Sequence, residues 1–171
     1  MTDELVDVVD ENDRVIGQEM KWVCHKKGLW HRISGILLFN SEGKVWLQTR
    51  ASHKMSGGLL DFSASGHIGA VHSYEDGAYR ELKEELGVKA KLRLIQKILY
   101  EKIDIDNFKV RHSIAVYIGI HDGPFKIQED ELEKIDAYDL VEMKKLVEKD
   151  SPRMTKGLKL GLKSYFDHIE K

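Results

Sequence analysis

The segment from Gly66 to Val88, GHIGAVHSYEDGAYRELKEELGV, constrains this chain more than any other part of it. Ser73 can cap a helix together with Asp76 three residues later, and Gly87 can end that helix. Apolar side chains recur between these limits at helical spacing, at Tyr74, Ala78, Leu82 and Leu86. The pattern predicts a glycine-containing loop followed by a helix that packs on a sheet through one face.

Three glutamates gather on one side of this predicted helix. Glu85 is four residues after Glu81, and Glu84 is three residues after it. Like charges at such spacings destabilise an isolated helix by about 0.2–0.5 kcal/mol a pair, a cost that a divalent cation would reverse. Clustered oxygen ligands suit Mg²⁺ or Mn²⁺. We expect the carboxylates to point outward, and the alternative is a solvated charged face that includes Arg80 and Lys83.

The size and composition of the chain predict one globular domain over residues 1–171. Hydrophobic residues make up 42% of the chain and charged residues 33%, and no repeat or linker divides it. The 27 Lys and Arg residues nearly balance the 29 Asp and Glu residues, so no overall cationic field would draw the protein onto nucleic acid or an anionic membrane. Its function must therefore depend on a local site.

The N-terminal sequence and the single cysteine bear on location. The chain begins with acidic residues where a signal peptide is basic, and no apolar run approaches the roughly 20 residues that cross a bilayer. Cys24 has no partner for a disulfide within the chain, which fits a reducing compartment. We therefore expect a cytoplasmic protein without nucleic-acid or membrane partners. Its oligomeric state stays open, a homodimer included.

Strands and helices are mixed along the chain, with the helices late, which predicts an α+β fold. The predicted strands are Leu5–Val9, Val15–Gln18, Ile33–Asn40, Val45–Arg50, Lys91–Tyr100 and Val110–Ile120. Glycines at high density predict a loop from Lys54 to Gly69. Asp139 with Glu142 predicts a short helix, and Ser151-Pro152 predicts the start of a longer one through Phe166.

The segment from 66 to 88 also resembles a known motif. Gly66, Arg80-Glu81-Leu82, Glu84-Glu85 and Gly87-Val88 stand at the spacing of the Nudix box, G-x5-E-x7-R-E-U-x-E-E-x-G-U, where U is aliphatic. The first glutamate of the box is the position that fails, because His72 stands there. The resemblance implies the Nudix fold, a mixed β-sheet sandwiched between helices, as a single domain.

Carried over position by position, the resemblance implies a metal site and a reaction. Glu81 and Glu85 would be metal ligands, and Glu84 would be a further ligand or a base that positions water. Arg80 would orient the neighbouring carboxylate. The implied cofactor is Mg²⁺ or Mn²⁺. The implied reaction is hydrolysis of a nucleoside diphosphate linked to another group, or of a similar diphosphate.

The departure at His72 affects this implied site. A histidine in place of a glutamate removes one negative charge, which should weaken Mg²⁺ binding. Glu75 is an alternative carboxylate, but we favour an exposed His72 without a role and no substitution by Glu75. Gly66 and His67, at the start of the box, are the implied contacts to the substrate.

More of the chain resembles the branch of the family akin to isopentenyl diphosphate isomerase. The segments that carry this resemblance include DVVDENDRVIG, CHKKGLWHR and LLDFSASGH. True isomerases have a catalytic cysteine before the Gly-His pair, where this chain has Ser65. They also take metal ligands from histidines, which His25, His31 and His67 could match, and from two glutamates on a later strand, which the region Lys109–His112 does not offer. We therefore expect a hydrolase-like relative rather than an isomerase.

Several other polar or aromatic residues have two interpretations. For His25 and His31 we favour hydrogen bonding in a turn, and for His112 a satisfied strand position. Three tryptophans, Trp22, Trp30 and Trp46, could line a base-binding pocket but more often fill cores. The acidic turn Glu129–Glu133 could send one carboxylate to the metal, although a solvated turn is favoured. The lysines at 156, 159 and 163 fit the polar face of an amphipathic helix. The competing function is a binding or regulatory module with a weakened metal site.

Overall fold

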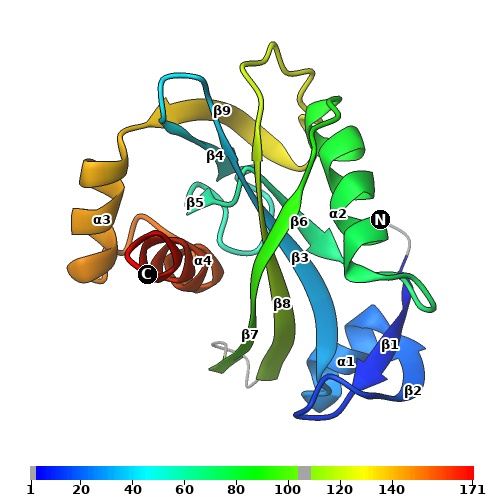
Figure 1. The fold of residues 1–171 in the computed structure, drawn as a ribbon. Coiled ribbons are helices and arrows are strands. Elements are labelled where there is room, and N and C mark those ends of the chain that lie inside the picture. Colours follow the sequence, from blue (N-terminus) through cyan, green and yellow to red (C-terminus); the bar gives the residue numbers. More distant parts are fainter. Residues whose placement is uncertain (1–2, 104–108) are drawn as a thin grey trace.

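The computed structural model describes residues 3–103 and 109–171 and contains a mixed sheet with helices on both faces (Figure 1). The strands are β1 (Leu5–Val9), β2 (Val15–Met20), β3 (His31–Phe39), β4 (Val45–Arg50), β5 (Leu60–Asp61), β6 (Ala64–His67), β7 (Arg93–Ile103), β8 (Lys109–Ile120) and β9 (Leu132–Tyr138). The helices are α1 (Lys21–Lys27), α2 (Tyr74–Glu81), α3 (Leu140–Glu148) and α4 (Lys156–Ile169), and α2 continues into a π-helical turn, η1 (Leu82–Leu86).

Strand β3 is the centre of the sheet. One of its edges pairs with β8 in parallel along its whole length, from His31 opposite His112 to Phe39 opposite Ile120. The other edge is divided among three antiparallel partners, β1, β6 and β4. β6 pairs with Ile33–Ile36 of β3 and β4 with Leu38–Phe39, and β4 and β6 are not paired with each other in the described sheet, so the sheet splits between them. The chain after β6 passes through residues 68–73 into α2.

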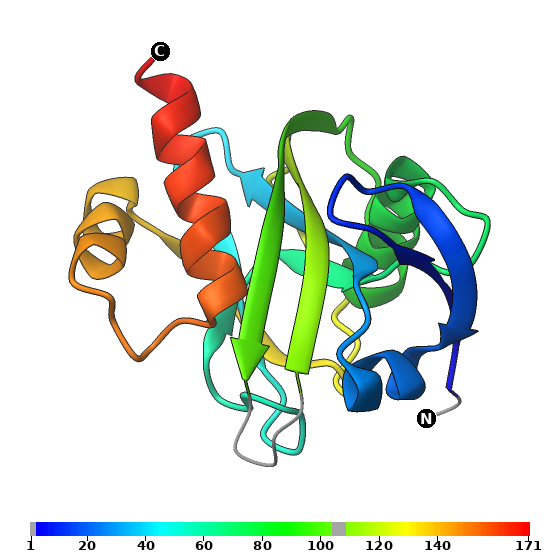
Figure 2. The same cartoon turned by 90° about the horizontal axis from the view of Figure 1, so that it is seen from below.

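Alternating side chains of β3 build two hydrophobic layers. Leu37 and Phe39 belong to a core cluster that includes side chains of α3 and α4, whereas Ile36 and Leu38 belong to a cluster that includes side chains of α2. Figures 1 and 2 show α2 on one side of the sheet and α3 with α4 on the other. The predicted arrangement, a mixed sheet between helices, is therefore confirmed.

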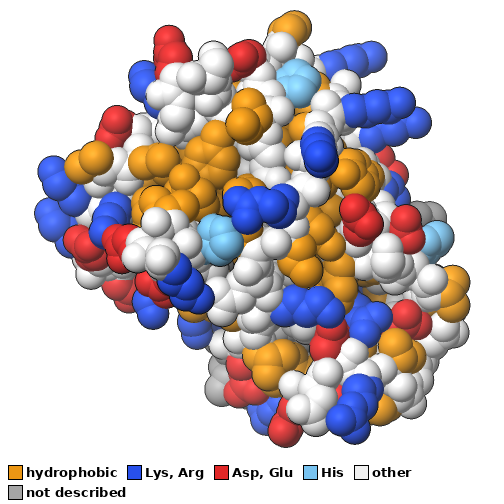
Figure 3. Space-filling view, in the orientation of Figure 1, with side chains coloured by type: hydrophobic (Ala, Val, Ile, Leu, Met, Phe, Trp, Pro, Cys, Tyr) orange, Lys and Arg blue, Asp and Glu red, His pale blue; other side chains and the backbone are white. Residues whose placement is uncertain are grey.

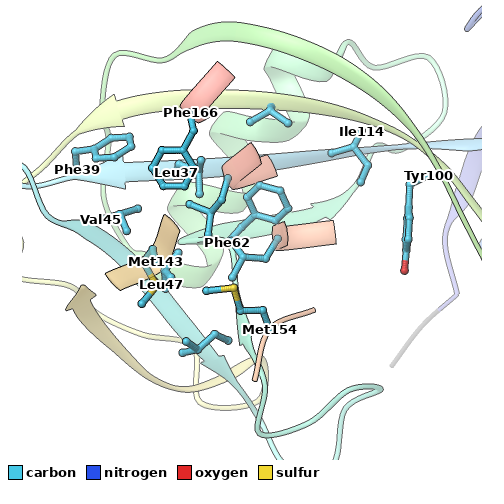
Figure 4. Packing of buried hydrophobic residues seen from close by; sticks show 14 of the residues in the cluster. Leu37, Phe39, Val45, Leu47, Phe62, Tyr100, Ile114, Met143, Met154 and Phe166 are labelled. Carbon is cyan, nitrogen blue, oxygen red and sulfur yellow. The ribbon is translucent and has the colours of Figure 1, made fainter. Parts of the chain in front are cut away.

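Phe62 joins the helix α4 to the sheet. Its ring lies where a Cβ atom at Gly35 of β3 or at Gly161 of α4 would overlap it, so both elements approach the ring with bare backbone. Figure 4 shows Phe62 among Leu37, Met154 and other side chains of this cluster. A buried aromatic ring held between two glycines fixes the distance between α4 and the sheet.

Most predicted elements are confirmed, with differences at short or charged segments. Ser73 and Asp76 form a reciprocal capping box at the start of α2, and Asp139 caps α3. The prediction that the last helix opens at Ser151-Pro152 is wrong, because Thr155 caps it and α4 begins at Lys156. The predicted loop from 54 to 69 contains β5 and β6, and the sequence patterns missed α1 and β9 altogether.

Acidic and basic side chains are mixed over the described surface. Figure 3 shows acidic and basic side chains spread over one face of the molecule, with hydrophobic side chains between them. Among residues 3–103 and 109–171, no helix combines the length and the apolar character needed to cross a membrane.

Candidate functional site

A cavity of about 680 Å³ contains the carboxylates of the box and a group of histidines. Its lining comes from both sides of the split in the sheet and from α1, α2, η1 and the loop before β9. The acidic side chains in it are Asp3, Glu4, Asp61, Glu81, Glu84, Glu85 and Glu131; the basic ones are Lys21, Arg50, Lys54, Arg80 and Lys102. The three histidines in the lining are His25, His67 and His112.

Glu81 is the last residue of α2 and lies against β6. A Cβ atom at Gly66 would overlap its carboxylate, so the glycine at the start of the box leaves the space that this carboxylate occupies. Arg80 Nη2 donates to Glu81 Oε1 at 3.0 Å and to the carbonyl oxygen of His67 at 2.7 Å. Arg80 Nη1 also donates to Glu4 at 3.0 Å. Arg80 thus holds its neighbour's carboxylate against the end of β6.

Glu85 lies in the π-helical turn η1, which widens the helix at this point. π-Helical turns of this kind occur frequently at functional sites. Gln48 of β4 donates from Nε2 to Glu85 Oε2 at 2.8 Å and to the carbonyl oxygen of Ser63 at 3.3 Å. Glu85 is 5% exposed and Glu81 8% exposed. Both residues line the cavity while being almost completely buried, so the expectation that their carboxylates point outward to solvent is wrong, and so is the alternative of a solvated charged face for these two residues.

Burial sets the ionisation of both carboxylates. Loss of hydration raises the pKa of Glu81 to about 7, against the opposing effect of Arg80. The pKa of Glu85 is raised well above its usual value by burial and by the charge of Glu81, while the bond from Gln48 lowers it. A divalent cation would compensate these charges, and carboxylate oxygens are the ligands that Mg²⁺ and Mn²⁺ prefer. The donor set therefore fits the ion that the box implies.

Glu84, the third glutamate, and His72, which replaces the first glutamate of the box, lie in different places. Glu84 is exposed and lines the cavity. His72 and Glu75 are both exposed, and neither is among the described residues that line the cavity. The interpretation of His72 as an exposed loop residue agrees with this position, and Glu75 does not replace the missing carboxylate.

Two cations of the cavity are held by acidic partners. Arg50 Nη1 lies 2.8 Å from Asp61 Oδ2. Lys54 Nζ lies 2.7 Å from Glu131 Oε2. The favoured interpretation of the acidic turn as simply solvated is wrong for Glu131, which is half-buried in the cavity and contributes to the raised pKa of Glu85.

Four histidines form a cluster at the other end of the site. The nitrogens of His25, His31, His67 and His112 that could bind a metal all lie within 4.8 Å of one another. His31 Nδ1 also lies 2.9 Å from the carbonyl oxygen of Leu29, so the expected turn hydrogen bond exists but is only part of its environment. Ser65, which stands where an isomerase has its cysteine, lines the same cavity.

The family resemblance links His25, His31 and His67, but no local sequence pattern adds His112 to them. The register of the sheet places His112 opposite His31, and His67 opposite Ile33, two residues further along β3. All three side chains therefore point to the same face, where α1 brings His25. The interpretation of His112 as a satisfied strand histidine is wrong, because its Nε2 is buried and has no hydrogen-bond partner in the described part of the chain.

The tryptophans lie elsewhere. None of the three is among the described residues that line the large cavity. Trp22 is 51% exposed, and the Trp46 indole donates to the carbonyl oxygen of His121 at 2.9 Å while it packs on Phe125. Trp30 lines a smaller surface hollow beside Arg111. The favoured interpretation of these rings as core side chains is therefore wrong for Trp22.

Comparison with known sequences gives consistent matches. Residues 29–159 match the NUDIX domain. The isopentenyl-diphosphate Delta-isomerase of Serratia proteamaculans is 35% identical over 123 residues, which cover 71% of this chain and 68% of that protein. An uncharacterized Nudix hydrolase of Pseudomonas aeruginosa is 36% identical over 131 residues, which cover 75% of each chain.

Solved structures extend the likeness to the fold. The crystal structure of DR0079 from Deinococcus radiodurans superposes with a TM-score of 0.77 at 21% identity and covers 95% of this chain and 99% of that one. The NUDIX domain of Shewanella oneidensis NrtR, solved with ADP ribose, gives a TM-score of 0.62 at 17% identity and covers 82% of this chain and 88% of that one. At these identities the likeness concerns the fold alone.

Proposed function

This chain belongs to the Nudix family, and from that premise we propose that it is a divalent-metal-dependent hydrolase of diphosphate bonds. Its substrate would be a nucleoside diphosphate linked to another group, or a similar diphosphate. The observation that carries the proposal is the pair of buried carboxylates, Glu81 and Glu85, in one cavity with the exposed carboxylate of Glu84. Buried like charges are costly, and a bound cation would give them a function.

The positions of the charged box residues support a role for each of them in metal binding or in the reaction. Glu81 and Glu85 would hold Mg²⁺ or Mn²⁺, with Arg80 fixing the first carboxylate and Gln48 the second. A bound divalent ion supplies positive charge that neutralises phosphate oxygens and makes water more acidic. Glu84 is exposed to the cavity and would accept a proton from the attacking water or join the ligand set.

The cavity also offers a binding surface for the diphosphate itself. Arg50 and Lys54 line it, each already oriented by an acidic partner. Lys21 lines the histidine end of the same cavity. Cations fixed in this way can bind phosphate oxygens without a further loss of side-chain freedom. With a divalent ion bound at the glutamates, these cations would complete a binding surface for an anionic substrate.

A panel of substrates tests the proposal. The protein would be incubated with Mg²⁺ or Mn²⁺ and nucleotide sugars, dinucleotides, nucleoside di- and triphosphates, or prenyl diphosphates. We expect phosphorylated products from at least one class, and a loss of at least about 100-fold in kcat/KM for Glu85→Gln. Glu75→Gln is the matched control, because Glu75 is an exposed glutamate that is not among the cavity-lining residues.

The same panel separates the alternatives. If no substrate gives a product and calorimetry shows no binding of Mg²⁺ or Mn²⁺, the hydrolase is contradicted and a binding or regulatory module is favoured. Conversion of isopentenyl diphosphate to its allylic isomer would favour the isomerase, the activity named for several relatives and opposed by Ser65. His72→Glu restores the sequence of the box; because residue 72 is exposed and outside the described lining of the cavity, we expect no large change in metal affinity, and a clear rise would show that this position supports the metal site.

A further inference from the structure

The guanidinium of Arg80 is shared between two carboxylates. Its Nη2 atom donates to Glu81 Oε1, and its Nη1 atom donates to Glu4 Oε1, each at 3.0 Å. Glu81 belongs to the box, whereas Glu4 lies directly before β1, 76 residues before Arg80 in the chain. Both carboxylates belong to residues that line the cavity. Arg80 therefore connects an acid of the N-terminal segment with a candidate metal ligand.

Backbone hydrogen bonds on both sides fix the place of Glu4. Its own carbonyl oxygen accepts from the N–H of Lys21 at 2.8 Å, where α1 begins. The carbonyl oxygen of the next residue, Leu5, accepts from the N–H of Ala70 at 2.8 Å, in the loop of the box. The segment that carries Glu4 is thus bound to α1 and to the loop of the box, which it approaches from outside.

Glu4 also reaches the place where the box departs from its pattern. From the position that a Cβ atom would take at Gly69, Glu4 Oε1 is 3.1 Å away, His72 Cδ2 3.3 Å and Arg80 Nη1 3.8 Å. The ring that stands in place of the box glutamate therefore lies beside the ion pair of Glu4 and Arg80. A carboxylate on residue 72 and the carboxylate of Glu4 would share this small region.

The effect of this ion pair should lie in geometry more than in stability. The side chains of Arg80 and Glu4 are 36% and 30% exposed, and ion pairs with this much exposure contribute little to the free energy of unfolding. The pair does restrict the guanidinium, whose other acceptors are Glu81 and the carbonyl oxygen of His67. Without Glu4, Arg80 would keep two of these three acceptors and would hold the Glu81 carboxylate less firmly.

We propose that Glu4 is a positioning residue that supplies, from outside the box, the carboxylate that the box lacks at residue 72. It holds Arg80, and Arg80 holds the carboxylate of Glu81. This inference rests on the proposed metal site, and it explains how the site keeps its geometry although His72 has replaced a glutamate. Loss of such an outer partner typically costs about 10–100-fold in metal affinity or activity.

Manganese binding tests the role of Glu4 without a substrate. Full-length protein would be titrated with Mn²⁺, and the free ion would be measured by electron paramagnetic resonance. We expect Glu4→Gln to weaken Mn²⁺ binding by about tenfold or more, because Arg80 loses the partner that fixes it. Glu11→Gln should bind as the wild type does, because Glu11 is an exposed glutamate outside the described lining of the cavity.

Moving the carboxylate to residue 72 separates positioning from a merely structural role. His72→Glu alone should change Mn²⁺ binding little, because Glu4 already lies beside Arg80. Combined with Glu4→Gln, it should restore the affinity to within about threefold of the wild type, because a carboxylate returns to the same region. Residue 72 is not among the described residues that line the cavity, so this rescue would act through Arg80 and not through a new metal ligand.

A double-mutant cycle with Arg80 completes the test. In Arg80→Ala protein, Glu4→Gln should lower Mn²⁺ affinity by less than about twofold, because the residue through which Glu4 acts is already gone. If Glu4→Gln does not fold, Glu4→Asp replaces it. Its side chain is shorter by one methylene group, which withdraws the carboxylate from Arg80 and should weaken Mn²⁺ binding in the same direction.

The outcomes separate this role from the hydrolase proposal. Unchanged Mn²⁺ affinity in Glu4→Gln, no rescue by His72→Glu, or a full further loss in Arg80→Ala protein would each overturn the role of Glu4 and leave the hydrolase in place. A wild-type protein that binds no Mn²⁺ would overturn both. The titration needs no substrate, so a panel without products leaves these results as they stand.

Discussion

Gly66 and Glu81 form a close pair that connects the first residue of the box with one of its carboxylates. The glycine lacks the Cβ atom that would overlap the Glu81 carboxylate, and Arg80 holds that carboxylate from the other direction. The carboxylate is the end of a flexible side chain, so a larger residue at 66 would displace it without unfolding the protein. A residue without a functional group thus determines where a functional group lies.

Gly66→Ala is therefore expected to impair function more than stability. The added methyl group would push the Glu81 carboxylate away from its place, and a ligand displaced by about 1 Å can cost on the order of 100-fold in rate. The Tm should fall by no more than a few degrees. Kinetics with Mg²⁺ and a thermal melt check this, and unchanged kcat/KM would show that the contact has no role.

Glu81→Gln should stabilise the metal-free protein, and more at high pH than at low pH. Because burial raises the pKa of Glu81 from 4.5 to about 7, the folded state binds the proton more tightly than the unfolded state, and stability is lost as pH rises through this window. A neutral glutamine does not ionise, so the variant does not lose this stability as the pH rises. The gain in the free energy of unfolding should be about 2–3 kcal/mol at pH 8 and about 1 kcal/mol or less at pH 5.

Chemical denaturation in EDTA at the two pH values measures this difference. Glu75→Gln, at an exposed position of the same helix, should show no comparable change. A gain for Glu81→Gln that is the same at pH 5 and pH 8 would contradict the assigned direction of the pKa shift.

The helix α2 with the turn η1 shows how much of an element can be predicted from sequence. Ser73, Asp76 and the apolar spacing predict its start and its packed face, and Gly87 ends it in the left-handed conformation. The π-helical turn was not predicted, because the spacing of apolar residues over five positions does not distinguish it from an α-helix. This turn sets the position of Glu85, so the buried arrangement of the carboxylates was missed with it.

Other elements escaped prediction because they depend on distant partners. α1 has seven residues and no side-chain cap, and β9 carries several charged residues while pairing with β4, more than 80 residues earlier in the chain. The place of His112 in the histidine cluster was missed for the same reason, although the family resemblance links His25, His31 and His67. The members of the cluster gather only through the register of β3 with β6 and β8, which no local pattern contains.

Ser73→Ala tests the start of α2. The variant removes the bond from the backbone N–H of Asp76 to the Ser73 hydroxyl and half of the capping box. The expected loss in the free energy of unfolding is about 1 kcal/mol. Urea denaturation measures it, with the exposed Ser52→Ala as control; equal effects of the two changes would show that the cap does not stabilise the helix.

The whole molecule is divided by its sheet into a side with α2 and a side with α3 and α4, and the cavity reaches both through the split beside β3. Binding of an ion in that split therefore acts on the stability of the complete fold. For an ion present at 100 times its dissociation constant, the gain is about 2.7 kcal/mol.

The gain in Tm with Mg²⁺ should be larger at pH 8 than at pH 6. Protons compete with the ion for Glu81 and Glu85, whose pKa values are both raised, so metal affinity falls as pH falls below about 7. Thermal melts with and without Mg²⁺ at both pH values measure the difference. Equal gains at pH 6 and pH 8, or a full gain in Glu85→Gln, would contradict a carboxylate site.

The ring of Phe62 between Gly35 and Gly161 has a consequence for anyone who redesigns this protein. The three positions share one volume, so a larger residue at either glycine requires a smaller side chain at 62. A designer who varies them together could change how far α4 stands from the sheet. The C-terminal helix would then be an adjustable part, set by three residues that lie far apart in the chain.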